Sequence, residues 1–148
     1  AGVVTLPPQP DERLQSDVIW RDPLVFMCAP EHTLAKVDNI TLETLTGYSA
    51  ILPSPVTFTR GIVERLFDEH NLKLNIAMST NYLETIHMMV SIGLGWSVLP
   101  ATMVDGSVVE LAVDVPLPER ELGVVTHPAR TRSNAARAFL QALEASGL

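Results

Sequence analysis

The sequence of 148 residues holds a single cysteine, few aromatic residues (5%) and fewer basic than acidic side chains. One cysteine excludes an internal disulfide bond and suits a reducing compartment. The apolar run PLVFMCA around Cys28 favours a small buried hydrophobic side chain over a reactive thiol. The formal net charge of −7 argues against direct binding of nucleic acid, which requires a basic surface.

Long apolar runs are also missing. No stretch approaches the roughly 18 consecutive apolar residues that predict a membrane-spanning helix, and the first residues lack the order of a signal peptide. We therefore expect a cytoplasmic protein without membrane contacts. With 47% hydrophobic residues the chain is able to form a core, and its length suits one domain or two small lobes. The opening run AGVVTLP begins without Met, which favours a piece of a longer protein.

Apolar periodicity predicts alternating strands and helices along the chain. Strands are expected at 2–6 (buried), at 18–29 in two pieces joined around Asp22 and Pro23, and at 48–52, 72–78, 96–100, 108–115 and 122–126. Helices are expected at 42–46, 60–70, between Asn81 and Gly93, and from Ser133 or Asn134 to Gly147. Alternation at these spacings is typical of crossover connections, so it predicts an α/β fold with a largely parallel sheet.

Residues at the helix ends support this assignment. Thr41 is expected to cap the helix at 42–46, which Gly47 ends. Asn81, with Glu84 three residues later, has the spacing of a capping box.

The segment SIGLGWSVLP, residues 91–100, contains glycines that suggest a catalytic or phosphate-binding loop. A dinucleotide loop requires a third glycine where Val98 stands, and it follows a strand, whereas a helix precedes this segment. A nucleophile elbow requires glycine in place of Leu99 after Ser97. The favoured interpretation is structural: Gly93 ends a helix and Gly95 lets the backbone turn into a strand.

Other chemically active side chains do not form a recognisable pattern. The histidines are far apart in sequence, at His32, His70, His87 and His127, and no cysteine joins them, so no metal site is predicted. Asp68 and Glu69 are adjacent on a polar helix face, which is ordinarily solvated. We therefore predict no catalytic residue, no cofactor and no enzymatic activity.

Hydroxyl and amide side chains follow several predicted strands, where α/β sheets bind ligands beside helix N-termini. The candidate ligand-binding residues are Thr5, Ser54, Thr57, Asn81 and Thr126. Such groups beside free backbone N–H donors favour a small anion, such as a carboxylate. The structural alternative is that these residues are only helix caps, which is the commoner role of Ser, Thr and Asn at helix starts.

Three motifs in this order resemble those of one known family. They are PEHTLA at 30–35, ITLETL at 40–45, and VSIGLGWSVLP at 90–100, with an Arg opening the helix between the last two. The set resembles the effector-binding domain of LysR-type transcriptional regulators, in which P-x-H-P-L, T-L-x-x-L and G-x-G-[IV]-x-x-L-P segments recur. Trp96 replaces the usual small aliphatic residue and Thr33 the usual proline. The resemblance covers residues 2–143.

The resemblance implies a two-lobed fold of the type 2 periplasmic-binding-protein class. Lobe two would be complete at 22–116, and lobe one would be partial, formed by 1–21 and 117–148. It also implies a small effector, an organic acid or similar anion, held between the lobes by Thr5, Ser54 and Asn81, with Thr57 and Thr126 as weaker candidates. Homodimers or tetramers are typical of the family, and DNA contact belongs to an N-terminal domain that is absent from this sequence.

Two other functions share this fold. A solute-binding protein of a transporter would carry a signal peptide, and the HTLA segment counts against it. A small enzyme such as a dehydratase would carry an acid or base among the hydroxyls and amides at the strand ends.

Overall fold

A computed structural model provides the fold of the chain and describes residues 2–6, 11–117 and 119–146. The backbone forms two compact units. Unit 1 comprises Ala1–Asp22 and Glu119–Leu148, and unit 2 comprises Pro23–Pro118. The chain therefore passes from unit 1 to unit 2 after Asp22 and returns before Glu119.

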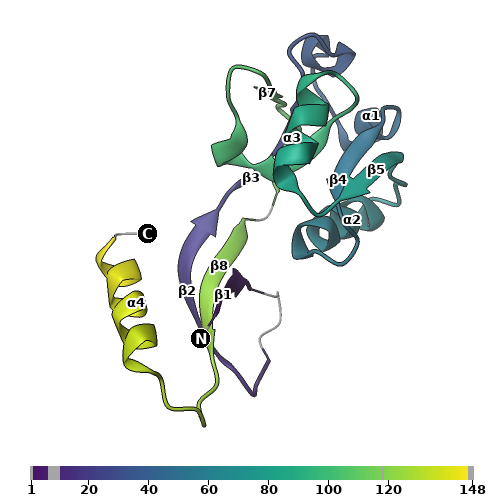
Figure 1. The fold of residues 1–148 in the computed structure, drawn as a ribbon. Helices are drawn as coiled ribbons and strands as arrows, with labels where there is room; N and C mark the ends of the chain where they lie inside the picture. Colours follow the sequence, from purple (N-terminus) through teal and green to yellow (C-terminus); the bar gives the residue numbers. More distant parts are fainter. Residues whose placement is uncertain (1, 7–10, 118, 147–148) are drawn as a thin grey trace. The chain divides into compact units, whose positions relative to one another are not determined.

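The strands of unit 2 lie at its centre (Figure 1). They are β3 (Leu24–Cys28), β4 (Ala50–Pro53), β5 (Ile76–Thr80), β6 (Ser97–Pro100) and β7 (Val109–Glu110). Hydrogen bonds order them as β6-β3-β7 and β4-β5. A parallel bridge between Ala50 and Trp96 links the two sets, and the Ile51 N–H donates to the Trp96 carbonyl at 2.9 Å.

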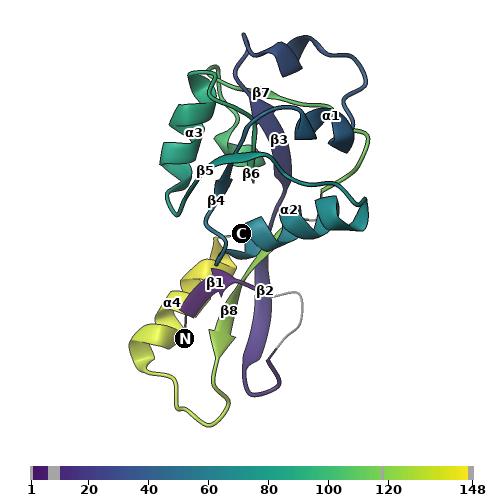
Figure 2. The same ribbon diagram turned by 90° about the vertical axis from the view of Figure 1, so that its right-hand side faces the viewer.

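The strands of unit 2 have helices on both faces (Figure 2). The helical segments are η1 (Thr33–Lys36), α1 (Leu42–Thr46), α2 (Phe58–Glu69), α3 (Leu83–Ser91) and η2 (Ala101–Met103). Leu52 of β4 packs in a cluster with Val63 and Phe67 of α2. The preceding residue, Ile51, packs instead with Ile86 of α3, because consecutive strand residues point to opposite faces. In the part of the chain that the structure describes, no helix has both the length and the apolar content needed to cross a membrane.

The prediction of a largely parallel sheet is wrong. Among the described residues, parallel pairing is limited to β4 with β5 and to the isolated bridges Ala50–Trp96 and Ile40–Val113, whereas β3 is antiparallel to both β6 and β7. The helical crossovers through α2 and α3 do join parallel strands, as the alternation of elements predicted. The remaining strands are not joined by helical crossovers. Without that constraint, neighbouring strands can pair in the antiparallel direction.

Trp96 lies at the centre of the unit 2 core with no exposed surface. Its ring is stacked on Phe67, at 5.8 Å between centroids, and tilted against Phe26. The indole N–H donates to the Leu45 carbonyl at 3.0 Å, which satisfies its one polar group. Trp96, which stands where the family usually has a small aliphatic residue, is therefore a central residue of the core.

Most predicted helix ends are confirmed. Thr41 caps α1, its hydroxyl accepting from the Thr44 N–H, and Gly47 ends the helix. Gly93 follows α3 with φ +86, the left-handed conformation expected of a glycine at that place. The predicted Asn81 cap is wrong: Tyr82 is the N-cap of α3 and no side chain caps it, because the helix begins one residue later than predicted.

Two predicted strands are shorter in the structure. The alternating segment from Leu72 is irregular until β5 begins at Ile76, yet Leu72 and Leu74 still pack against the core. Their alternation therefore reflects burial without strand pairing. The segment predicted at 108–115 forms only β7, followed by an isolated bridge between Val113 and Ile40.

Unit 1 consists of a small antiparallel sheet and one helix. The elements are β1 (Gly2–Thr5), β2 (Gln15–Asp22), β8 (Arg120–Thr126) and α4 (Asn134–Ala145). The sheet order is β1-β8-β2. Ser133 and Asn134 were the two predicted starts of the last helix, and Ser133 is the residue that caps α4. The predicted end of this helix at Gly147 lies outside the described residues.

The opening strand was predicted to be buried, and this is wrong. Val3 and Val4 are 51% and 44% exposed. β1 pairs with β8 through its backbone, but no described element of unit 1 covers these side chains. The α4 helix, which has an apolar stripe, also has no buried residue.

Candidate functional site

The carboxyl edge of β4 and β5 brings three predicted site residues together. The parallel register pairs Pro53 with Thr80, so Ser54 and Asn81 leave the two strands side by side. The Ser54 N–H donates to the Thr80 carbonyl at 3.1 Å, which joins the two loops. Thr57 follows in the same loop as Ser54, at the start of α2.

The side chains of these three residues differ in whether their hydrogen-bonding groups are already used within the protein. The Thr57 hydroxyl accepts from the Arg60 N–H at 3.2 Å and donates to the Ser54 carbonyl at 2.8 Å, so it shapes the turn. The Ser54 hydroxyl and the Asn81 amide make none of the side-chain hydrogen bonds found among the described residues, and Asn81 is exposed. Ser54 and Asn81 are therefore the side chains free to contact a ligand.

The start of α3 adds backbone donors to the same edge. Its N-cap Tyr82 contributes no side-chain hydrogen bond. The N–H groups of Leu83 and Glu84, in the first turn, have no intrahelical acceptor and no partner among the described residues. Free donors at a helix N-terminus attract anions, although the Glu84 carboxylate in the same turn weakens this attraction.

A buried arginine lies behind this edge. Arg60 is 6% exposed and stands in the first turn of α2. Its guanidinium donates to the Pro53 carbonyl and to the Ser79 hydroxyl, both at 2.9 Å, and to the Glu64 carboxylate at 2.7 Å. Sequence reasoning missed its place at the site. The available signal was a cation in the first turn of a helix, where the dipole disfavours positive charge unless other groups compensate.

The other two predicted residues, Thr5 and Thr126, belong to unit 1. Because β1 and β8 are antiparallel, Thr5 pairs with Leu122 whereas Thr126 lies beyond the Gly2–Val125 pair. The two threonines are therefore at opposite ends of this ladder. Parallel strands would have placed both carboxyl ends at one edge of the sheet.

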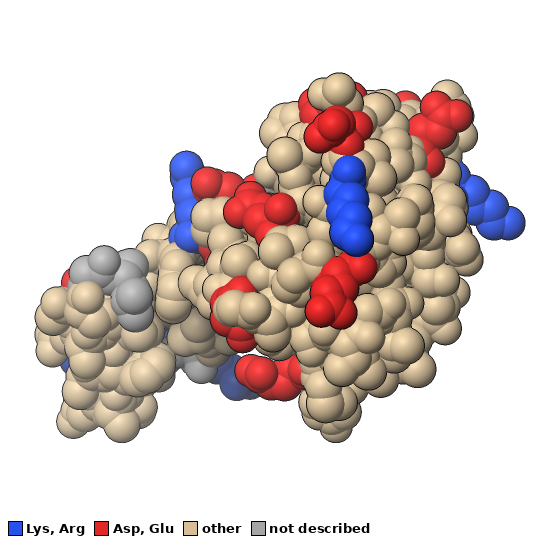
Figure 3. Space-filling view, turned by 90° about the horizontal axis from the view of Figure 1, so that it is seen from above, with Lys and Arg blue, Asp and Glu red and all other residues tan. Residues whose placement is uncertain are grey.

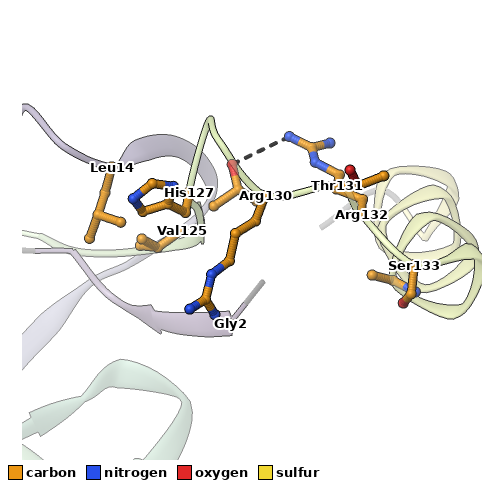
Figure 4. A pocket seen from close by; sticks show the side chains of 10 residues that line it. Gly2, Leu14, Val125, His127, Arg130, Thr131, Arg132 and Ser133 are labelled. Atoms are coloured by element: carbon orange, nitrogen blue, oxygen red, sulfur yellow. Dashed lines mark hydrogen bonds between the residues drawn. The ribbon is translucent and has the colours of Figure 1, made fainter.

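Thr126 instead lines a separate open pocket in unit 1, of about 500 Å³. Its hydroxyl accepts from the Arg132 guanidinium at 3.3 Å. Figure 4 shows the Arg130 side chain reaching toward Gly2, and His127 and Ser133 also line the pocket. This pocket gathers basic side chains on an otherwise acidic chain, and it shares no residue with the edge of β4 and β5.

The two side chains that the sequence offered as possible nucleophiles, Ser97 and Cys28, are both inaccessible to solvent. Ser97 and Cys28 have no exposed surface, and the Ser97 hydroxyl has no hydrogen-bond partner among the described residues. Burial raises the pKa of the Cys28 thiol to about 11, so the reactive thiolate is absent at neutral pH. The predicted role of Cys28 as a buried hydrophobic residue is confirmed.

A histidine, an aspartate and a serine do meet in unit 2, which sequence spacing did not indicate. Asp105 accepts from the Ser107 hydroxyl at 2.5 Å, and its other oxygen lies 3.4 Å from the Nε2 atom of His87. The Ser107 contacts hold the pKa of Asp105 below its usual value, and His87 contributes less. The carboxylate is thus between the serine and the histidine, whereas a nucleophilic triad needs the histidine in the middle.

The described residues offer no group of three or more His, Cys, Asp or Glu side chains placed to bind a metal ion. On the face shown in Figure 3, acidic side chains are scattered and the lysine and arginine side chains stand singly. The candidate site at the edge of β4 and β5 therefore consists of hydroxyl, amide and backbone groups.

A comparison with known protein families agrees with the motifs. The model described as "LysR substrate binding domain" matches residues 1–147. The chain belongs to this family.

Curated relatives of this LysR substrate-binding domain are transcriptional regulators. YeiE of Escherichia coli, an uncharacterised HTH-type regulator, is 36% identical over 80% of this chain and 42% of its own length. YfeR of Shigella flexneri is 26% identical over 97% of this chain and 48% of its length. The chain spans about half the length of the curated relatives that it matches along most of its residues.

Solved structures share the fold. The regulatory domain of Synechocystis CcmR in complex with 2-PG has a TM-score of 0.85 and 26% identity, covering 98% of this chain and 72% of that one. The effector-binding domain of QuiR in complex with shikimate has a TM-score of 0.83 at 23% identity, with 98% and 70% covered. These neighbours are effector-binding domains, so the predicted two-lobed fold class of type 2 periplasmic-binding proteins is confirmed.

Proposed function

We propose that this chain is the effector-sensing part of a LysR-type transcriptional regulator and that its ligand is a small organic acid. The ligand would be held at the edge of β4 and β5 by the Ser54 hydroxyl, the Asn81 amide and the free N–H groups of α3. One observation carries this proposal: the parallel register sets Ser54 and Asn81 side by side where α2 and α3 begin.

The family supports the same conclusion. CcmR and QuiR are seen with small molecules bound to their corresponding domains, and the curated relatives are regulators, not transport proteins. In this proposal unit 2 corresponds to lobe two and unit 1 to part of lobe one. Thr5 remains a proposed contact on the family pattern alone, Thr57 shapes the loop, and Thr126 is left out because it lies at the other end of its ladder.

The proposal includes partners beyond the ligand. As in the family, DNA would be bound by an N-terminal domain outside this sequence, and the regulator would act as a homodimer or tetramer in the cytoplasm. Catalysis is not part of the proposed activity, because the accessible groups of the site are donors without a paired acid and base. A ligand with different affinities for two arrangements of the domain would shift the balance between them.

Calorimetric titration of the full-length protein with small carboxylic acids, including shikimate, tests this function. Each acid is compared with its methyl ester, which keeps the shape and removes the charge. We expect an acid to bind and its ester to bind at least about tenfold more weakly, since charge-assisted hydrogen bonds contribute about 1.5–3 kcal/mol. Equal affinities for acid and ester would contradict an anion site.

A matched pair of variants locates the site. Asn81→Ala removes the amide just after β5, whereas Asn75→Ala removes an exposed amide just before the same strand. We expect Asn81→Ala to weaken acid binding about tenfold and Asn75→Ala to leave it unchanged. If both variants bind like the natural protein, the ligand is held elsewhere.

A further inference from the structure

Arg60 is the one described residue whose side chain bonds to both strands of the candidate site. One guanidinium nitrogen donates to the carbonyl of Pro53, the last residue of β4, and to the hydroxyl of Ser79 in β5. A second nitrogen donates to Glu64 one turn along α2. The side chain thus joins α2, β4 and β5 immediately behind the loops that carry Ser54 and Asn81.

We infer that Arg60 is the positioning residue of the acid site, an inference that rests on the proposed function. By holding the ends of β4 and β5 at a fixed separation, it sets the distance between the Ser54 hydroxyl and the Asn81 amide. The contact that it protects is the hydrogen bond from the Ser54 N–H to the Thr80 carbonyl.

The geometry requires arginine and not merely a positive charge. The guanidinium is a planar fork with several donors in fixed directions, so it serves Pro53, Ser79 and Glu64 together. A lysine at this position carries one ammonium group on a flexible stem and is unable to reach all three acceptors in the same way. Arg60→Lys therefore keeps the charge and removes the fork.

The charge itself has a second effect at the site. The Arg60 side chain is 7% exposed, and its single carboxylate partner, Glu64, is 44% exposed. The buried guanidinium thus adds positive charge at the edge where α2 begins, which favours an anionic ligand over a neutral one. Glu64→Gln leaves the fork in place and removes the partner's charge, so it separates the effect of charge from that of position.

Hydrogen exchange of the Ser54 amide is the decisive measurement. We expect Arg60→Lys to speed this exchange by about tenfold. Ser79→Ala, at an exposed residue, removes only the hydroxyl that accepts from Arg60 and should speed the exchange by a smaller factor. Arg65→Lys, an exposed arginine on the same helix, should leave it unchanged. The Ile51 amide, bonded to the Trp96 carbonyl in the core, reports global unfolding and should not change in Ser79→Ala. Unchanged exchange at Ser54 in both Arg60→Lys and Ser79→Ala would overturn the inference.

Binding of the acid separates this inference from the proposed function. If Ser54 exchange rises in Arg60→Lys but no acid binds the natural protein, the positioning role stands and the proposed ligand is wrong. If an acid binds, Arg60→Lys should weaken it about tenfold while the acid-to-ester ratio of affinities is retained, because the charge is still present. Glu64→Gln should raise that ratio without changing Ser54 exchange. If Arg60→Lys binds the acid as tightly as the natural protein does, the proposed function is retained and the positioning role of Arg60 is wrong.

Discussion

In unit 2, Trp96 and Phe67 are at most 1% exposed, whereas in unit 1 Trp20 is 40% exposed and Phe139 is 54% exposed. The contrast extends to whole elements. The helices α2 and α3 each bury residues against the strands, while α4 has no buried residue. Of the apolar side chains described in unit 1, Val124 is the only one that is buried. Similar residue types therefore form a closed core in one unit and an open surface in the other.

The difference shows which unit is stabilised by packing of its own side chains. Unit 2 has two core clusters, one on each face of its strands, and its stability comes from burial within one continuous segment. In unit 1 the sheet is held mainly by backbone pairing, and its exposed valines and tryptophan are typical of a surface that another element or another chain covers. The candidate site belongs to the better packed unit, which suits a site that needs fixed geometry.

The sharpest test of this contrast uses the two tryptophans, one in each unit. Trp96→Ala should lower the free energy of unfolding by about 3–5 kcal/mol, because it leaves a large cavity and removes the stacking on Phe67. Trp20→Ala should cost less than about 1 kcal/mol. Urea unfolding followed by circular dichroism measures both. Similar losses from the two substitutions would contradict the difference in packing.

A second test compares two glycines that both face a backbone oxygen. A Cβ atom on Gly95 would lie 2.3 Å from the Ser49 carbonyl oxygen, and one on Gly123 would lie 2.5 Å from that of Asp17. Gly95→Ala should destabilise the protein by about 1–3 kcal/mol, because the packed strands of unit 2 have little room to shift. Gly123→Ala should cost less, since β2 is an edge strand. The fluorescence of Trp96 and Trp20 follows each unit during unfolding.

The open space around a third glycine supplies the control for these substitutions. Gly61 is exposed within α2, and a Cβ atom there meets no atom within 4 Å. Gly61→Ala should therefore stabilise the protein slightly, by about 0.5–1 kcal/mol, because alanine has the higher helix propensity. A loss of stability in Gly61→Ala would indicate that the costs at Gly95 and Gly123 are not due to steric contact.

Burial in unit 2 also predicts a pH effect through Cys28. Its thiol has a pKa of about 11 in the folded protein, raised by burial, whereas an unfolded cysteine ionises near its ordinary value of about 8.5–9. Between these values the unfolded chain loses its proton first, so the contribution to stability present below pH 9 is lost as the pH rises toward 11. The stability of the natural protein relative to Cys28→Ala should fall over this interval. A constant difference would show that the thiol is accessible to water.

Local patterns predicted much of unit 2 correctly because its sequence signals agree with its packing. Thr41 and Gly47 bound α1 as expected, and α3, which buries Ile86 and Val90, lies between Asn81 and Gly93 as predicted. Strand direction was not predictable from these signals, since the pattern of a strand is the same in either direction. The place of Thr126 at the far end of its ladder from Thr5 depends on that direction.

The candidate site was predicted in part for the same reason. Ser54 and Asn81 follow strands joined by a helical crossover, so their proximity followed from topology. The role of Arg60 depends on side-chain contacts with Pro53, in the preceding strand, and with Ser79, in the following strand, and neither contact leaves a periodic signal in the sequence. The exposure of unit 1 was unpredictable as well, because the apolar stripe of α4 has the same pattern whether or not it is covered.

The smallest expected effect belongs to Phe139, and it tests whether the apolar stripe of α4 is free in solution. Phe139→Ala should change the free energy of unfolding by no more than about 0.5 kcal/mol, since the side chain is already exposed. The matched substitution in unit 2, Phe67→Ala, should cost about 3–5 kcal/mol. If Phe139→Ala costs more than about 1 kcal/mol, the stripe of Ala136, Phe139, Leu140 and Leu143 is covered in solution. A loss that grows with protein concentration would then identify a second copy of the chain as the cover.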